Sequence, residues 1–180
     1  SEKELVKSIF PNTEIKQVVY HGSKSKLPFK TAKTEQEKVW PDGSKSVKKG
    51  FYVTRVKKYA EAYSKDGHLA TVIVNVQKPL RSDKPIIQGN LPKLDGTQDS
   101  IIGIELGISK TESIVLFKPE QIHILTEAEQ SKIDNEENKS KINAKYDAEL
   151  AAVESTPKQT TAEVEAEVES EQANKQEVRD

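Results

Sequence analysis

A histidine and a glycine end an apolar run near the start of the chain, within "VVYHGS" at residues 18–23. A neutral imidazole can donate or accept a hydrogen bond, and a glycine lets another group approach the backbone closely. His21 and Gly22 are therefore candidate binding residues at the end of a strand. The competing interpretation is a surface turn, in which the glycine breaks the strand and the histidine is incidental.

Two later stretches supply aromatic rings and a carboxylate. Tyr52 and Tyr63 lie in "GFYVT...AEAY", residues 50–63, and Glu112 opens the apolar run "ESIVLF". An aromatic ring offers a flat surface to a planar group, and a fixed carboxylate stabilises positive charge that develops during a reaction. Each residue also has a structural interpretation. Tyr63 shares a helical face with Tyr59 and so fits a core position, and Glu112 fits a surface position at the start of a strand.

Composition disfavours several other chemistries. The chain has no cysteine, so it can form neither a disulfide nor a thiol nucleophile. Three histidines without a cysteine disfavour a zinc site, and we predict no metal. No apolar run approaches the length of a membrane span, so we expect no membrane contact. We expect an intracellular location, in keeping with the lack of cysteine.

Charge is unevenly distributed along the chain. Residues 1–125 hold 21 Lys and Arg against 14 Asp and Glu, a balance of +7, and residues 126–180 hold 7 against 15, a balance of −8; the two sum to the net −1. A basic body favours an anionic ligand or target, such as a nucleotide, a nucleic acid or an acidic protein. Scattered lysines on a solvated surface are the alternative explanation.

Hydrophobic patterning predicts the elements that position these residues. A lysine-rich loop is expected over 23–49, with a short helix near 34–39, and a connector rich in proline and glycine over 78–98. Strands dominate, which indicates an α+β sandwich rather than a parallel doubly wound sheet. We expect helices over 2–9 and 55–65, and strands over 15–20, 50–54, 69–77, 100–106, 112–117 and 121–125.

The amino-acid composition changes at Thr126, which forms a predicted capping box with Glu129. A helix is expected over 127–154, with a narrow apolar stripe on a largely solvated surface. The repeated "AEVE" unit beyond Pro157 has too few apolar residues to hold a fold together. We therefore divide the chain into a folded domain over 1–125, a charged helical stalk over 126–156 and an acidic, low-complexity mobile tail over 157–180.

The motifs occur in an order that resembles the ADP-ribosyltransferase domain of the His-Tyr-Glu type, which toxins and poly(ADP-ribose) polymerases share. The variants carried by phage and mobile-element polyvalent proteins look most similar. The resemblance covers about residues 5–125 and implies a split antiparallel β-sandwich with small helices. It rests on His21-Gly22, Gly50-Phe51-Tyr52, Tyr63, "DSIIG" at 99–103, Glu112 and the "FKPEQI" segment at 117–122.

The resemblance implies that NAD is the substrate and that Glu112 stabilises the positive charge on its ribose as nicotinamide leaves. Tyr52 and Tyr63 would stack against the nicotinamide ring, a contact worth roughly 0.5–1.5 kcal/mol beyond the buried area. These assignments make the domain a mono-ADP-ribosyltransferase that modifies a macromolecular target. The chain shows no acceptor site for building a polymer.

The remaining assignments concern the strand that contains His21. The resemblance implies that His21 bonds the ribose of the adenosine half, that the backbone of Gly22 bonds the nicotinamide carboxamide, and that Ser23 contacts a ribose. The implied catalytic residues are Glu112, Tyr52 and His21. Lysines of the 24–49 loop would meet the pyrophosphate.

The chain departs from the family pattern at two positions. Ala60 stands where a small polar residue often bonds nicotinamide, and Lys110 stands where arginine-modifying relatives carry glutamate. The acceptor, protein or nucleic acid, is therefore not deducible. RNA 2′-phosphotransferase activity would need arginines to hold phosphate, and only Arg55 and Arg81 precede the tail.

Two alternatives to a fully active transferase remain. The domain could be a weak or inactive module that binds NAD or ADP-ribose within a phage or mobile-element structural protein, or a scaffold protein. The acidic tail could contact a partner or the basic body, or act only as a linker. The resemblance further suggests an effector delivered into a target cell by a phage or a secretion system.

Overall fold

Two mainly antiparallel sheets, joined along one pair of strands, form the body of the protein. The computed structural model describes residues 1–25, 31–106 and 110–155. The chain divides into two units, Ser1–Ile133 and Asp134–Asp180, and the described residues of each are treated separately. The elements in chain order are α1 (Glu2–Ile9), β1 (Val19–Ser23), β2 (Glu35–Val39), β3 (Lys45–Lys49), β4 (Phe51–Val53), α2 (Lys57–Ser64), β5 (His68–Val74), β6 (Pro79–Arg81), β7 (Ser100–Leu106), β8 (Lys110–Leu116), the 3-10 turn η1 (Pro119–Gln121), β9 (Ile122–Ile124) and α3 (Glu127–Ser155).

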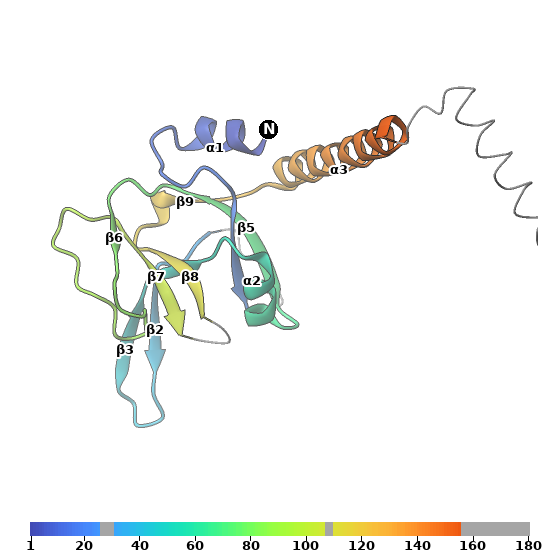
Figure 1. The fold of residues 1–180 in the computed structure, drawn as a ribbon. Helices are drawn as coiled ribbons and strands as arrows, with labels where there is room; N and C mark the ends of the chain where they lie inside the picture. The colour runs from blue at the N-terminus through green and yellow to red at the C-terminus, as the bar shows by residue number, and fades with distance from the viewer. Residues whose placement is uncertain (26–30, 107–109, 156–180) are drawn as a thin grey trace, which may run out of the picture. The chain divides into compact units, whose positions relative to one another are not determined.

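The first sheet has the strand order β1-β5-β9 and the second has the order β4-β8-β7-β6, with β6 and β7 parallel and the other pairs antiparallel (Figure 1). The sheets join where Tyr20 and Thr54 exchange two backbone hydrogen bonds of 2.8 and 2.9 Å. Strands β2 and β3 form a separate hairpin. The predicted α+β fold of the ADP-ribosyltransferase type, with antiparallel sheets and a C-terminal helix, is therefore confirmed.

Alternating apolar residues build the main core between the sheets. Val19 and Val72 from the first sheet and Val53 and Ile114 from the second are at most 2% exposed. Helix α1 covers the outer face of the first sheet, where Val6 is fully buried in a second cluster. Because successive side chains of a strand point to opposite faces of the sheet, the remaining side chains of these strands face away from this core.

Gln121 explains the "PEQI" part of the last motif. Its side-chain oxygen accepts hydrogen bonds from the backbone N–H groups of Phe117 and Lys118, and its amide nitrogen donates to the carbonyls of Asn75 and Asp99. The residue is 8% exposed. One side chain therefore connects the ends of β5, β7 and β8, and its role is structural.

The predicted helix near 34–39 is wrong, because residues 35–39 form β2 of a hairpin within the expected loop. Asp42 accepts hydrogen bonds from the backbone and hydroxyl of Ser44, and Gly43 has a φ of 84°, which together form a tight turn. The hairpin carries few apolar residues, so the alternation that usually reveals strands is weak. Residues 26–30 of that expected loop lie outside the described part of the chain.

Two boundaries also differ from expectation. Strand β1 begins at Val19 rather than 15 and continues to Ser23, so His21 and Gly22 lie within the strand and pair with Ala70 and Leu69. The predicted connector over 78–98 contains the short strand β6. The other predicted helices and strands are confirmed, with ends that shift by up to three residues.

Helix α3 begins with the predicted capping box. Thr126 Oγ1 accepts a hydrogen bond of 3.2 Å from the backbone of Glu129, whose side chain accepts one of 2.9 Å from the backbone of Thr126. The first unit extends through Ile133, which is 5% exposed in the second cluster. No helix within residues 1–25, 31–106 and 110–155 has the length and apolarity that crossing a bilayer requires. The predicted tail over 157–180 lies outside the described residues.

Candidate active site

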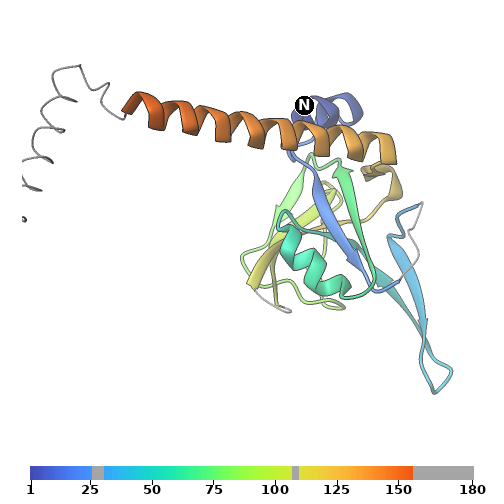
Figure 2. The same cartoon turned by 90° about the vertical axis from the view of Figure 1, so that its right-hand side faces the viewer.

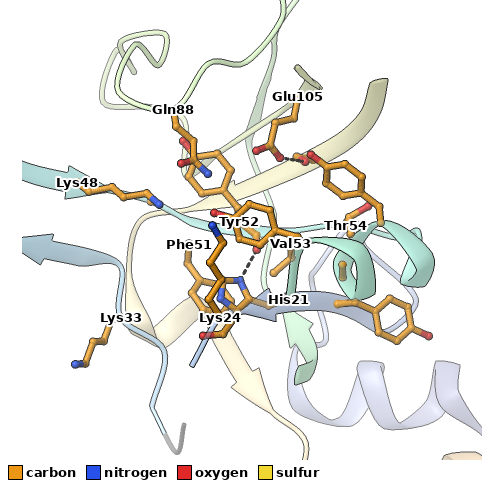
Figure 3. A pocket seen from close by; sticks show the side chains of 18 of the residues that line it. His21, Lys24, Lys33, Lys48, Phe51, Tyr52, Val53, Thr54, Gln88 and Glu105 are labelled. Carbon is orange, nitrogen blue, oxygen red and sulfur yellow. Dashed lines mark hydrogen bonds between the residues drawn. The ribbon is translucent and has the colours of Figure 1, made fainter. Parts of the chain in front are cut away.

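A cavity of about 380 Å³ opens between β1, α2 and the second sheet, to which β4 belongs (Figure 3). Five of the six predicted site residues line it: His21, Gly22, Ser23, Tyr52 and Tyr63. They come from three elements that are separated in sequence. The volume falls within the range of small-molecule sites, roughly 300–1,000 Å³.

Strand pairing explains how these residues share a cavity. The pairing of Tyr20 with Thr54 brings the end of β4 beside β1. Beyond this pair, the hydrogen bond between His21 Nδ1 and the carbonyl oxygen of Tyr52 connects the two strands. Helix α2 packs against β1 and adds Tyr63 to the cavity wall.

Gly22 is required by packing alone. A Cβ at this position would lie 2.1 Å from the carbonyl oxygen of Ala60 and 3.1 Å from the backbone nitrogen of Ser64, both in α2. Only a residue without a side chain lets the helix approach the strand this closely. The contact of its backbone with nicotinamide stays a prediction.

His21 is held by two neighbours in β4. Its Nδ1 donates a hydrogen bond of 2.6 Å to the carbonyl oxygen of Tyr52, and its ring stacks on Phe51 with centroids 4.0 Å apart and planes inclined by 18°. Burial lowers the pKa of His21, although the bond to Tyr52 acts in the opposite direction and the charge of Lys48 adds to the lowering. The imidazole is therefore a neutral, oriented group near neutral pH.

The two tyrosines lie near ammonium groups. Lys48 Nζ is 5.8 Å from the centroid of the Tyr52 ring, and Lys24 Nζ is 5.7 Å from that of Tyr63. Burial, followed by the charge of Glu105, raises the pKa of Tyr52 to about 12. Its hydroxyl therefore stays protonated throughout the physiological range, and the uncharged ring remains suited to stacking.

Glu112 lies apart from the cavity. It occupies β8 opposite Ile104, is not a lining residue, and has a side chain that is 45% exposed. One carboxylate oxygen lies 3.7 Å from Nε of Arg55. Its neighbour Ser113 faces the cavity, and alternation along the strand turns Glu112 to the opposite face. The structure thus joins His21 and Tyr52 but does not bring Glu112 to them.

Among the described residues, the carboxylate that lines the cavity is Glu105 of β7, which was not among the predicted site residues. It is 7% exposed and accepts a hydrogen bond of 2.6 Å from Ser113 Oγ (Figure 3). Burial, the charge of Glu105 and a hydrogen bond to it raise the pKa of the Tyr59 hydroxyl. The available signal was its spacing: Glu105 shares a strand face with the buried Ile101 and Gly103.

The electrostatics of the cavity favour an anionic ligand with a flat end. Among the described lining residues, Lys24, Lys33 and Lys48 carry positive charge and Glu105 carries negative charge. The lysines lie toward β1 and the hairpin, whereas the acid lies on the second sheet. The two ends of the cavity therefore suit different parts of one ligand.

The split α+β sandwich with antiparallel sheets matches the fold that the resemblance to the ADP-ribosyltransferases implies. Comparison with family models confirms it: the model described as ADP-ribosyltransferase in polyvalent proteins matches residues 15–178. The chain belongs to this family. The match extends further than the motifs, which end near residue 125. A search of curated proteins found no match.

Proposed function

We propose that the chain is an NAD-dependent mono-ADP-ribosyltransferase that uses this cavity to bind NAD. The observation that carries the proposal is the convergence of Tyr52, Tyr63, Gly22 and His21 on one cavity with a cationic rim. The nicotinamide ring would lie at Tyr52 and Tyr63, with its carboxamide near the backbone of Gly22. Because the reaction consumes NAD, we place the activity inside a cell.

The reaction breaks the bond between C1′ of the ribose and the nicotinamide nitrogen, and nicotinamide leaves with the electron pair. A nucleophile of the acceptor forms the new bond to C1′ and gives up its proton. The intermediate sugar carries positive charge, so a nearby carboxylate lowers the barrier. His21 would hold the adenosine ribose, with Ser23 beside it, and Lys24 and Lys48 would neutralise the pyrophosphate.

Two carboxylates are candidates for stabilising the sugar. Glu112 is the residue that the resemblance implies, and we retain it as a proposal; it would have to leave Arg55 and turn toward the cavity. Glu105 already lines the cavity. Replacing the acting residue by glutamine should reduce turnover about 10²- to 10³-fold, so Glu105→Gln and Glu112→Gln, assayed together by nicotinamide release, identify it.

Calorimetric titration with NAD tests binding at the cavity. Tyr52→Ala should raise the dissociation constant for NAD about 2- to 12-fold, which is the loss expected for one stacking contact. Tyr52→Phe keeps the ring and should bind NAD like the wild type. Tyr146→Ala is the matched control, because Tyr146 lies on α3 and is 59% exposed. Equal NAD affinity in all four proteins would exclude the cavity as the NAD site.

The second candidate is a module that binds NAD or ADP-ribose without transferring it. The position of Glu112 outside the cavity favours this alternative, and so does Ala60, which offers no side-chain hydrogen bond there. The two candidates differ in one measurement. NAD binding without release of nicotinamide in the presence of cell lysate would support the module.

A further inference from the structure

The hairpin of β2 and β3 has one cationic face. Gln36 pairs with Lys48 and Lys38 pairs with Ser46, so these side chains point the same way. Trp40 follows on this face, since its Nε1 donates a hydrogen bond of 2.9 Å to Ser46 Oγ and Lys38 Nζ lies 4.1 Å from its ring centroid. We call these five residues the cationic hairpin face.

The opposite face of the hairpin is electrically balanced. It carries two acids, Glu35 and Glu37, against Lys45 and Lys49, with Lys45 and Glu37 in an ion pair of 3.2 Å. The cationic hairpin face carries two lysines and no acid. The pairing register therefore separates charge across the hairpin, which scattered surface lysines would not do.

The cationic hairpin face continues into the candidate active site. Gln36 and Lys48 both line the cavity, with Lys24 and Lys33 on the same rim. All ten residues of β2 and β3 are exposed, and the hairpin stands away from the two sheets in both views (Figures 1 and 2). A row of positive charge thus leads from the cavity to Trp40, a residue that is 44% exposed.

We propose that the cationic hairpin face binds single-stranded nucleic acid and presents it to the cavity as the acceptor, an inference whose second half rests on the proposed function. Lysines track phosphates as point charges, and an exposed indole stacks on an unpaired base. An acidic protein would match the lysines but would gain nothing specific from Trp40. The lysines supply no bidentate base contacts, so binding should depend little on sequence.

The transfer step leaves the nucleic acid covalently modified. The bond from C1′ of the ribose to nicotinamide breaks, and nicotinamide keeps the electron pair. A nitrogen or oxygen of the presented nucleotide forms a bond to C1′ and releases its proton to water. A base in a duplex is stacked on both faces and paired along one edge, so a single strand is the form that can place such an atom at the cavity.

Trp40 makes binding directly observable, because it is the only tryptophan of the chain. Titration with a short polythymidine DNA, without NAD, should quench its fluorescence. Removing a base-stacking residue weakens single-strand binding about 5- to 150-fold, so Trp40→Ala should reduce affinity by this factor when a dye-labelled oligonucleotide is followed by anisotropy.

A charge-matched pair of double variants tests the face itself. Lys38→Gln with Lys48→Gln should weaken binding and reduce the slope of log affinity against log salt by about 1.4, which corresponds to two phosphate contacts on a single strand. Lys45→Gln with Lys49→Gln removes the same charge from the opposite face and should change neither quantity appreciably. Circular dichroism melts confirm that the variants fold.

Three results would overturn the inference: no quenching at low salt, equal losses in the two double variants, or Trp40-dependent binding of polyglutamate in place of DNA. These outcomes are distinct from failure of the proposed function. Nicotinamide release without DNA binding would refute the hairpin surface and leave the enzyme intact. DNA binding without any NAD binding would support the surface and refute the enzyme.

Discussion

Replacing Gly22 by alanine perturbs the contact that shapes the cavity. The added methyl would lie 2.1 Å from the carbonyl oxygen of Ala60, whereas ordinary contact begins at 3.4 Å, so strand and helix must separate by 3.4 − 2.1 = 1.3 Å along that line. The opposing atom belongs to the backbone of α2 and cannot move alone. Helix α2 would therefore carry Tyr63 away from the opposite wall of the cavity.

Overpacking of this kind costs about 1–3 kcal/mol of unfolding free energy, which corresponds to a fall of roughly 3–15 °C in melting temperature for a domain of this size. Displacing Tyr63 also weakens one stacking contact, so the dissociation constant for NAD should rise about 2- to 12-fold. Thermal denaturation and calorimetric titration of Gly22→Ala measure the two effects separately.

Gly103→Ala is the matched control. Its methyl would meet the side chain of Ile86 at 3.0 Å, a partner that can shift, and Gly103 does not line the cavity. This variant should lose some stability and keep its affinity for NAD. If Gly22→Ala matches the wild type in both measurements, the close approach of β1 and α2 is refuted.

Three further predictions concern pH, the domain boundary and the last motif. The folded pKa of His21 lies below its usual 6.5, so the unfolded state binds more protons and stability is lost as pH falls below about 6.5. His21→Gln should therefore flatten the dependence of the unfolding free energy on pH between pH 7 and 5, as measured by urea denaturation. Ile133→Ala should lower the free energy of unfolding by about 2–5 kcal/mol in the same assay, whereas Ile142→Ala should cost almost nothing because Ile142 is 67% exposed. Equally small costs for both would return the boundary of the folded domain to residue 125. Gln121→Ala removes four hydrogen bonds and should cost about 2–4 kcal/mol, whereas a loss below about 0.5 kcal/mol would contradict its structural role.

Periodicity predicted most elements because their apolar residues are repeated at fixed spacing. Val72 and Val74 of β5, and Ile114 and Leu116 of β8, alternate as strands of a sandwich must. The hairpin of β2 and β3 was missed because both of its faces are exposed, so no apolar repeat marks it.

The candidate site was predicted in part. The order of the motifs identified His21, Gly22, Tyr52 and Tyr63, all of which line one cavity. The direction of a strand side chain depends on register, and a shift by one residue reverses it. Sequence order alone therefore could not show that Ser113, rather than Glu112, faces the cavity.

A crystal structure with a non-cleavable NAD analogue tests the central claim most directly. We predict that the nicotinamide ring lies in the cavity between Tyr52 and Tyr63, with the pyrophosphate toward Lys24 and Lys48. An analogue found instead on the other face of β8, beside Arg55 and Glu112, would contradict the assignment of this cavity as the active site.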